Sequence, residues 1–177
     1  MRIISVFLLV LMVGCGSDVS GMVSVSVDQL SEEQAQLALD ATDEALKGTP
    51  VITGNTDVNI DCYGGGTVTV EKSKTIERDP FLYDVDKTWT YTACQTHKGV
   101  TIDGTVTCMK EVKYSYADGL RIDCLYGGTL SYTGSVMGSC TIDVQYQADF
   151  RNHQFSYSGH YCNHPAVWWQ RLRHHCH

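Results

Sequence analysis

The chain has 177 residues, of which 43% are hydrophobic and 19% are charged, and its formal net charge is -7 at neutral pH. This composition is typical of a globular protein with one core and argues against extensive disorder. The negative charge argues against a nucleic-acid partner, because phosphate binding needs a basic surface that this sequence does not supply. We therefore expect one folded domain that binds no nucleic acid.

Residues 1–14 have the pattern of a secretory signal. Arg2 supplies a positive charge, an apolar run extends from Ile3 to Val13, and Gly14 is a small residue at the expected cleavage point. The apolar run is too short for a transmembrane helix, which needs about 20 apolar residues. We therefore expect the chain to be exported and the mature protein to lack this segment.

A lipid attachment site follows the apolar run. The segment Leu11-Met12-Val13-Gly14-Cys15 resembles the lipobox of bacterial lipoproteins, in which a small residue precedes an invariant Cys, although Met12 stands where that family most often has Leu. The resemblance implies that the thiol of Cys15 receives a diacylglyceryl group and that the new amino terminus is acylated, which palmitate labelling would detect. Several acyl chains make such anchoring effectively permanent. Gly16, rather than Asp, resembles lipoproteins sent on to the outer membrane, so we expect a lipid-anchored envelope protein facing the periplasm or the cell surface.

The mature chain is expected to divide into four segments. Residues 15–30 are the lipidated Cys and a small, polar stretch with the composition of a flexible tether. Residues 31–48 predict a helix, residues 51–164 an antiparallel β domain, and residues 165–177 a C-terminal tail. The membrane, reached through the lipidated N-terminus, is the expected partner, and any protein or small-molecule partner stays open.

The helix prediction for residues 31–48 rests on its two ends and on one narrow stripe. Ser31 and Gln34 form a capping-box pattern, and two glutamates in the first turn favour the positive end of the helix dipole. Gly48 and Pro50 are typical of a helix end. The apolar stripe consists of Ala38, Leu39, Ala41, Ala45 and Leu46.

From residue 51 onward apolar residues alternate with polar ones, which indicates strands with one buried and one solvent-facing side. The clearest stretches are 85–93, 100–116, 130–132 and 140–150. Turn signals between them are Lys98-Gly99, Asp118-Gly119, Gly127-Gly128, Gly138-Ser139 and Arg151-Asn152. The predicted fold is mainly β, an antiparallel hairpin meander preceded by one α-helix. Whether the sheet is a curved sheet, an open barrel or a small sandwich stays open.

The eight cysteines lie at wide intervals, as is typical of disulfides in an exported protein. The disulfide candidates are Cys62, Cys94, Cys108, Cys124, Cys140 and Cys162. Most of them stand at the alternate strand positions whose side chains point inward. Cys94 and Cys162 stand at the other positions, but near strand ends, where a bulge turns a side chain inward. The preferred pairs are Cys62 with Cys94, Cys108 with Cys124, and Cys140 with Cys162. Cys176 is left over, and other pairings stay open.

The sequence contains no nucleophile elbow, phosphate loop, His-Glu-x-x-His or Rossmann glycine pattern. Asp84 and Asp86 lie two residues apart on one strand, but no third oxygen ligand stands at loop spacing, so we interpret them as solvated surface charge. No catalytic residue and no cofactor are predicted.

Histidine and cysteine gather near the C-terminus, and both are ligands that zinc and copper prefer. The histidines concerned are His160, His164, His174, His175 and His177. Because Cys162 is expected to be oxidised and chain ends fray, we predict no metal site there. Trp168 and Trp169, beside two arginines, fit a membrane interface, a partner, or packing on the open end of the domain.

Three functions fit these observations. The first is a non-catalytic structural or binding module of the cell envelope, which the lack of catalytic patterns favours. The second is a carrier or sensor of a small apolar ligand in a curved sheet, lined by Trp89, Tyr91, Tyr114 and Tyr132. The third is a hydrolase in which His97, His153 or His160 meets an acid or a hydroxyl only in the folded chain.

Overall fold

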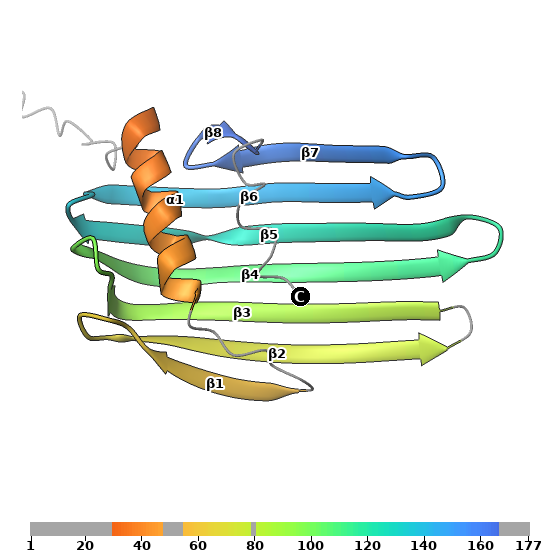
Figure 1. Ribbon diagram of the computed structural model, residues 1–177, viewed down its shortest axis with the longest axis horizontal. Helices are drawn as coiled ribbons and strands as arrows, with labels where there is room; N and C mark the ends of the chain where they lie inside the picture. The colour runs from red at the N-terminus through yellow and green to blue at the C-terminus, as the bar shows by residue number, and fades with distance from the viewer. Residues whose placement is uncertain (1–29, 48–54, 79–80, 167–177) are drawn as a thin grey trace, which may run out of the picture.

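The computed structural model describes residues 30–47, 55–78 and 81–166. Within them, one helix is followed by an antiparallel sheet of eight strands in the order β1-β2-β3-β4-β5-β6-β7-β8 (Figure 1). The elements are α1 (Glu32–Leu46), β1 (Thr56–Asp61), β2 (Thr67–Arg78), β3 (Phe81–Gln95), β4 (Val100–Ser115), β5 (Gly119–Gly134), β6 (Gly138–Asp149), β7 (Gln154–Tyr161) and β8 (His164–Pro165). The predicted hairpin meander is confirmed. Of the three architectures left open, the described chain forms a single open sheet, with β1 and β8 at opposite edges.

Helix α1 begins where the capping pattern predicts. The hydroxyl of Ser31 accepts a hydrogen bond from the backbone N–H of Gln34 (3.3 Å), and Gln34 Oε1 accepts one from the backbone N–H of Ser31 (3.1 Å). The buried side of the helix is built mostly from small residues: Ala35, Ala38, Leu39, Ala41, Thr42 and Leu46. The helix therefore lies close to the sheet and crosses its strands near one end (Figure 1).

Each strand places alternate residues on the face that α1 covers, here called the inner face, and the others on the outer face. In β6, Ile142 and Val144 are buried while Asp143 and Gln145 are exposed. On the outer face, the strand register aligns a row of threonines across β2 to β6: Thr69, Thr90, Thr105, Thr129 and Thr141. The predicted alternation of apolar and polar residues thus corresponds to an inner core and an outer surface.

One predicted turn is wrong. Gly127-Gly128 lies inside β5, where Gly128 has a φ of +149° and a Cβ atom would stand 2.2 Å from the carbonyl oxygen of Thr105 in β4. Gly104 in β4 shows the reverse contact, since its Cβ would stand 2.3 Å from the carbonyl oxygen of Thr129. These glycines allow two adjacent backbones to approach closely rather than reversing the chain.

Two of the predicted disulfides are confirmed. Cys62 bonds Cys94, and Cys140 bonds Cys162. The expected irregularities turn the second cysteine of each pair inward. The register shifts between Tyr91 and Cys94, and Cys162 itself has a φ of 48°.

The third predicted disulfide is wrong. Cys124 has a free, buried thiol, whereas Cys108 is disulfide-bonded to another cysteine. The reason lies in the register, because Cys108 pairs with Tyr126 and Cys124 with Lys110. The two cysteines are therefore diagonal neighbours, whose Cα atoms lie about 7–8 Å apart, beyond the roughly 4.4–6.8 Å that a disulfide needs.

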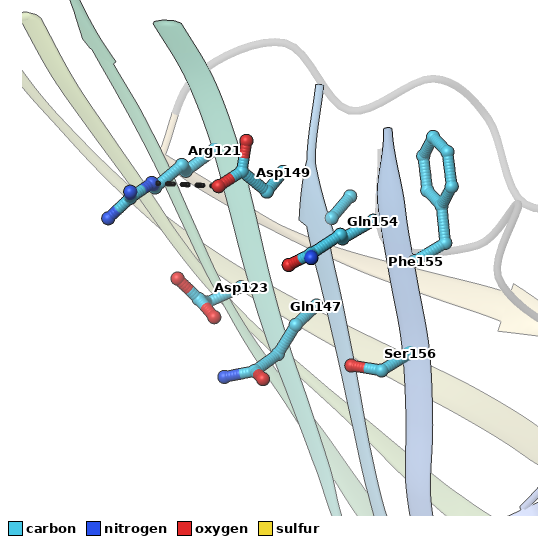
Figure 2. Close-up of a pocket in the computed structure, with 8 residues that line it drawn as sticks. Arg121, Asp123, Gln147, Asp149, Gln154, Phe155 and Ser156 are labelled. Carbon is cyan, nitrogen blue, oxygen red and sulfur yellow. Dashed lines mark ion pairs between the residues drawn. The ribbon is translucent and has the colours of Figure 1, made fainter. Parts of the chain in front are cut away.

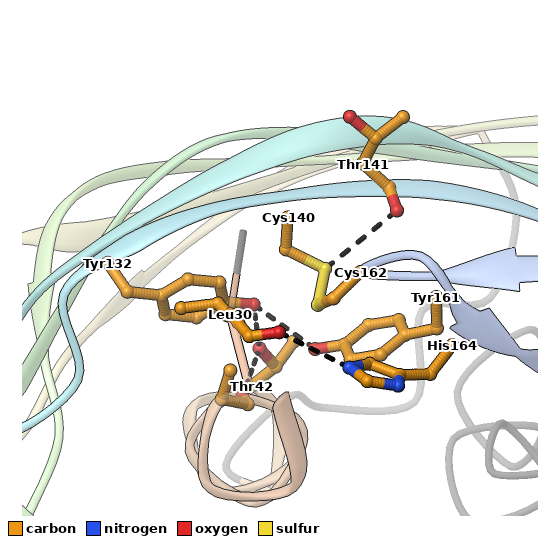
Figure 3. Close-up of a disulfide and its surroundings, with 9 residues drawn as sticks. Leu30, Thr42, Tyr132, Cys140, Thr141, Tyr161, Cys162 and His164 are labelled. Atoms are coloured by element: carbon orange, nitrogen blue, oxygen red, sulfur yellow. Dashed lines mark hydrogen bonds between the residues drawn. A yellow bond between two sulfur atoms is a disulfide. The ribbon is translucent and has the colours of Figure 1, made fainter. Parts of the chain in front are cut away.

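A chain of buried hydroxyl groups joins α1 to the sheet (Figure 3). The hydroxyl of Thr42 donates to the carbonyl oxygen of Ala38 (2.8 Å) and lies 3.0 Å from the hydroxyl of Tyr132, which lies 3.2 Å from that of Tyr161. Burial raises the pKa of the Tyr132 hydroxyl. This chain, together with the adjacent Cys140–Cys162 disulfide, fixes α1 over one end of the inner face and leaves the other end of the long strands without helix cover (Figure 1).

Candidate functional site

Apolar side chains gather at the end of the inner face that α1 does not cover. The connections β2–β3, β4–β5 and β6–β7 all lie at this end (Figure 1). The register places Phe81 opposite Tyr114 and Tyr114 opposite Leu120, and the backbone N–H of Phe150 donates to the carbonyl oxygen of Leu120 (3.0 Å). We name this surface the aromatic tip. Its residues are Ile76, Phe81, Tyr83, Val112, Tyr114, Leu120, Ile122, Phe150 and Phe155.

The aromatic tip is half exposed. The exposed fraction is 55% for Phe155, 51% for Ile76, 44% for Tyr114, 42% for Phe150 and 41% for Phe81. The rings of Phe150 and Phe155 meet edge to face, with centroids 5.6 Å apart. Contiguous large apolar side chains left in water are typical of an interaction surface, whereas single ones need no explanation.

Charges are segregated between the two faces of the sheet. Among the described side chains, the inner-face positions of the strands carry Lys72, Lys74, Lys87 and Lys110 but no Asp or Glu. Lys74 Nζ lies 5.1 Å from the centroid of the Tyr83 ring at the tip, within cation–π range. The aromatic tip is thus bordered by positive charge, although the whole protein is acidic.

Burial and mutual repulsion act on these lysines. Burial, followed by the charge of Lys72, lowers the pKa of Lys87 to about 8. Burial, followed by the charges of Lys74 and Lys110, lowers the pKa of Lys72. Like charges facing each other across strands are unfavourable. The pKa values of both lysines therefore reflect burial among neighbouring positive charges.

The carboxylates of the sheet lie on the outer face. Asp84 pairs with Glu111 in the adjacent strand, and burial, then Glu111, then Asp86 raise the pKa of Asp84. The hydroxyl of Ser73 donates to Asp86 (3.5 Å), and Lys113 forms an ion pair with Glu111. In the described parts of the chain, no three His, Cys, Asp or Glu residues are grouped so that they could hold a metal ion.

A polar groove of about 480 Å³ lies on the outer face at the same end of the sheet as the tip, lined from β5, β6 and β7 (Figure 2). Its residues are Arg121, Asp123, Gln147, Ala148, Asp149, Gln154, Phe155 and Ser156. Asp149 accepts hydrogen bonds from the backbone N–H and the side-chain amide of Asn152 (3.0 and 2.9 Å) and pairs with Arg121 (3.4 Å). These hydrogen bonds, followed by Arg121, lower the pKa of the Asp149 carboxyl. Asp149 thus holds the β6–β7 turn in place.

The four residues predicted to line an apolar site do not come together. Trp89, Tyr91 and Tyr132 are buried in the core, at 3%, 3% and 1% exposure. Tyr114 lies at the opposite end of the strands, in the aromatic tip. Only Tyr114 of this set is therefore part of the surface that the fold leaves open.

The candidate histidines also lie apart. His97 borders a pocket of about 240 Å³ beside the Cys62–Cys94 disulfide, where Glu44 accepts a hydrogen bond from its backbone N–H (2.6 Å). His153 lies in the β6–β7 turn, and His160 lies on the outer face of β7. His164 Nε2 lies 3.3 Å from the carbonyl oxygen of Leu30, at the start of α1. His174, His175, His177 and Cys176 lie outside the described residues.

The expected leader, Cys15, the tether through residue 29 and the tail from residue 167 also lie outside the described residues. In the part that the structure describes, no helix combines the length and the apolar character needed to cross a bilayer. No protein-family model, no curated protein and no solved structure matches the chain. The functional interpretation therefore depends on this chain's own surfaces.

No local pattern in the sequence predicts the aromatic tip, because its residues come from turns and strand ends far apart along the chain. One signal was present. Phe81, Tyr116 and Phe150 stand at or beside the turns that close one end of the sheet, where polar residues are the usual choice. Large apolar residues at three turns that lie at the same end of the sheet predict an exposed apolar surface there.

Proposed function

We propose that the protein is a cell-envelope lipoprotein, anchored to the outer membrane through Cys15, whose β domain is a non-catalytic binding module. The lipobox resemblance supports the location. The disulfides Cys62–Cys94 and Cys140–Cys162 agree with an oxidising compartment. The observation that carries the binding role is the aromatic tip, a contiguous, half-exposed apolar surface bordered by lysines.

The chemistry of the described residues favours binding over catalysis. Burial raises the pKa of the Cys124 thiol, which keeps it protonated and a poor nucleophile. The Glu44 carboxylate beside His97 accepts from the backbone N–H of that residue, whereas catalysis would use a carboxylate that orients the imidazole ring. The aromatic tip on the inner face offers contact area, and the polar groove on the outer face offers hydrogen-bonding groups, which are what binding surfaces need.

Metabolic labelling with palmitate tests the anchor. We expect label on the wild-type protein and none on the Cys15→Ala variant. The Cys124→Ala variant is the matched control, because it removes a free thiol elsewhere in the chain and should keep the label. Equal labelling of wild type and Cys15→Ala, or an unlabelled wild type, would overturn the proposed anchor.

A further inference from the structure

We infer that the aromatic tip inserts into the surface of an anionic lipid membrane, with Lys74 and Lys110 at the level of the headgroups. The inference rests on the proposed function in one respect, the identity of the membrane. The anchor on Cys15 would place the β domain against the leaflet that holds it. The attraction itself follows from the composition of the tip. It is independent of the lipid anchor expected on Cys15.

The side chains of the tip suit the interface between water and hydrocarbon. Tyr83 and Tyr114 combine an apolar ring with a hydroxyl, and such side chains prefer the headgroup region. Phe81 at the β2–β3 hairpin, and Phe150 and Phe155 at the β6–β7 hairpin, supply purely apolar area. Turn backbones must keep their hydrogen bonds to water, so the insertion is shallow. Only the half-exposed side chains then enter the apolar layer.

The charges of the inner face suit an anionic leaflet. A protein with a net charge of -7 is repelled by anionic lipids unless it presents a face of opposite sign. Lys74 and Lys110 precede the tip on the inner face, on strands β2 and β4, and both are partly exposed. Their apolar stems can lie along the aromatic rings while the ammonium groups reach phosphate. The strand carboxylates among the described residues face the other way.

A second copy of the chain is a less suitable occupant than a membrane. Two tips packed face to face would bring Lys74 and Lys110 of both copies together, and like charges across an interface are costly. An anionic leaflet neutralises the same lysines. At a membrane interface the tyrosine hydroxyls of the tip also keep their hydrogen bonds to water. A dry protein interface would have to supply these hydroxyls with other hydrogen-bond partners.

The expected anchor leaves enough chain for this placement. The longest strands have 16 residues, which corresponds to about 53 Å. The segment between Cys15 and Leu30 can span at most about 50 Å when extended. Because α1 crosses the strands some way in from their far end (Figure 1), the distance from α1 to the tip is shorter than a full strand, and the tip can touch the leaflet while α1 keeps its place.

Vesicle sedimentation tests the inference with the mature chain, residues 15–177, carrying Cys15→Ser so that no lipid contributes. We expect sedimentation with phosphatidylglycerol-rich vesicles and much less with phosphatidylcholine vesicles. Replacing Phe81 and Phe155 together by Ser should lower the partition coefficient by about tenfold or more, because each ring offers half its surface to the membrane. Lys74→Gln with Lys110→Gln should lower binding to the anionic vesicles by about tenfold and leave binding to phosphatidylcholine almost unchanged.

The Met137→Ser variant is the matched control. Met137 is 67% exposed and lies in the β5–β6 turn at the opposite end of the sheet, so we expect wild-type binding. Circular dichroism and thermal melting first verify that every variant is folded. The inference is overturned if wild type does not bind anionic vesicles, if the Phe variant binds as wild type does, or if the tip instead produces a dimer in sedimentation velocity. The Cys15→Ser chain carries no lipid anchor, so a failure to bind vesicles would not contradict the proposed anchor. Likewise, an absence of palmitate label on Cys15 would not contradict vesicle binding by the tip.

Discussion

The hydroxyl of Tyr132 is the central link between α1 and the sheet, and its removal gives a well-defined prediction. The Tyr132→Phe variant keeps a ring that is 1% exposed and loses the contacts to Thr42 (3.0 Å) and Tyr161 (3.2 Å). Each buried hydrogen bond contributes about 1 kcal/mol net, and the loss of a buried partner adds a desolvation cost of about 1–3 kcal/mol. We expect the free energy of unfolding to fall by about 2–3 kcal/mol.

Urea unfolding with the disulfides intact measures this change by linear extrapolation. Tyr114→Phe is the matched control, because its side chain is 44% exposed, and we expect a change below about 0.5 kcal/mol. In a double-mutant cycle, Tyr132→Phe and Thr42→Val should couple by about 1 kcal/mol. Equal losses for Tyr132→Phe and Tyr114→Phe, or a coupling energy near zero, would show that the hydroxyl chain does not hold the helix.

Three further predictions concern the disulfides, the free thiol and the pH dependence of stability. Replacing Cys140 and Cys162 by Ala opens a loop of 22 residues, so thermal or urea unfolding should show a loss of about 3 kcal/mol, and a loss below about 1 kcal/mol would contradict this. Burial of the Cys124 thiol, and its raised pKa, predict that peptide mapping finds this residue alkylated only after unfolding; alkylation of the native protein would refute it. The pKa of Lys87 is about 8 in the folded chain against 10.5 for the free side chain, so the unfolded chain binds more protons between these values and stability rises with pH. Allowing for solvent screening, we expect a rise of about 1–2 kcal/mol between about pH 8 and 10 that is absent in Lys87→Met; parallel pH profiles would contradict the assignment.

Local patterns in the sequence were sufficient for α1, β3, β4 and β6. The capping box of Ser31 and Gln34 places the start of α1, because both hydrogen bonds form within one helical turn. The strict alternation from Cys140 onward predicts β6, because successive residues of a strand face opposite sides. The Cys62–Cys94 and Cys140–Cys162 pairs were predicted from residue parity and from the bulges expected at strand ends.

Register and close approach, by contrast, depend on partners distant in sequence. Whether Cys108 meets Cys124 is decided by where β4 aligns with β5, and the observed alignment leaves them on a diagonal. Gly128 resembles a turn residue, but it serves to admit the backbone of Thr105. The conformational preferences of single residues do not determine the distance from Cys108 to Cys124 or from Gly128 to Thr105. The predicted disulfide and the predicted turn were wrong for this reason.

The sequence by itself determined a helix, a meander of amphipathic strands and two of the three predicted disulfides, because each follows from contacts within a few residues or from parity along one strand. Only the tertiary structure decided that the sheet stays open and that α1 covers one end of it. It also decided that Phe81, Tyr114 and Phe150 meet at the other end. Those residues come to the same end of the sheet because neighbouring strands pair in register, a property of the assembled sheet and not of any single segment.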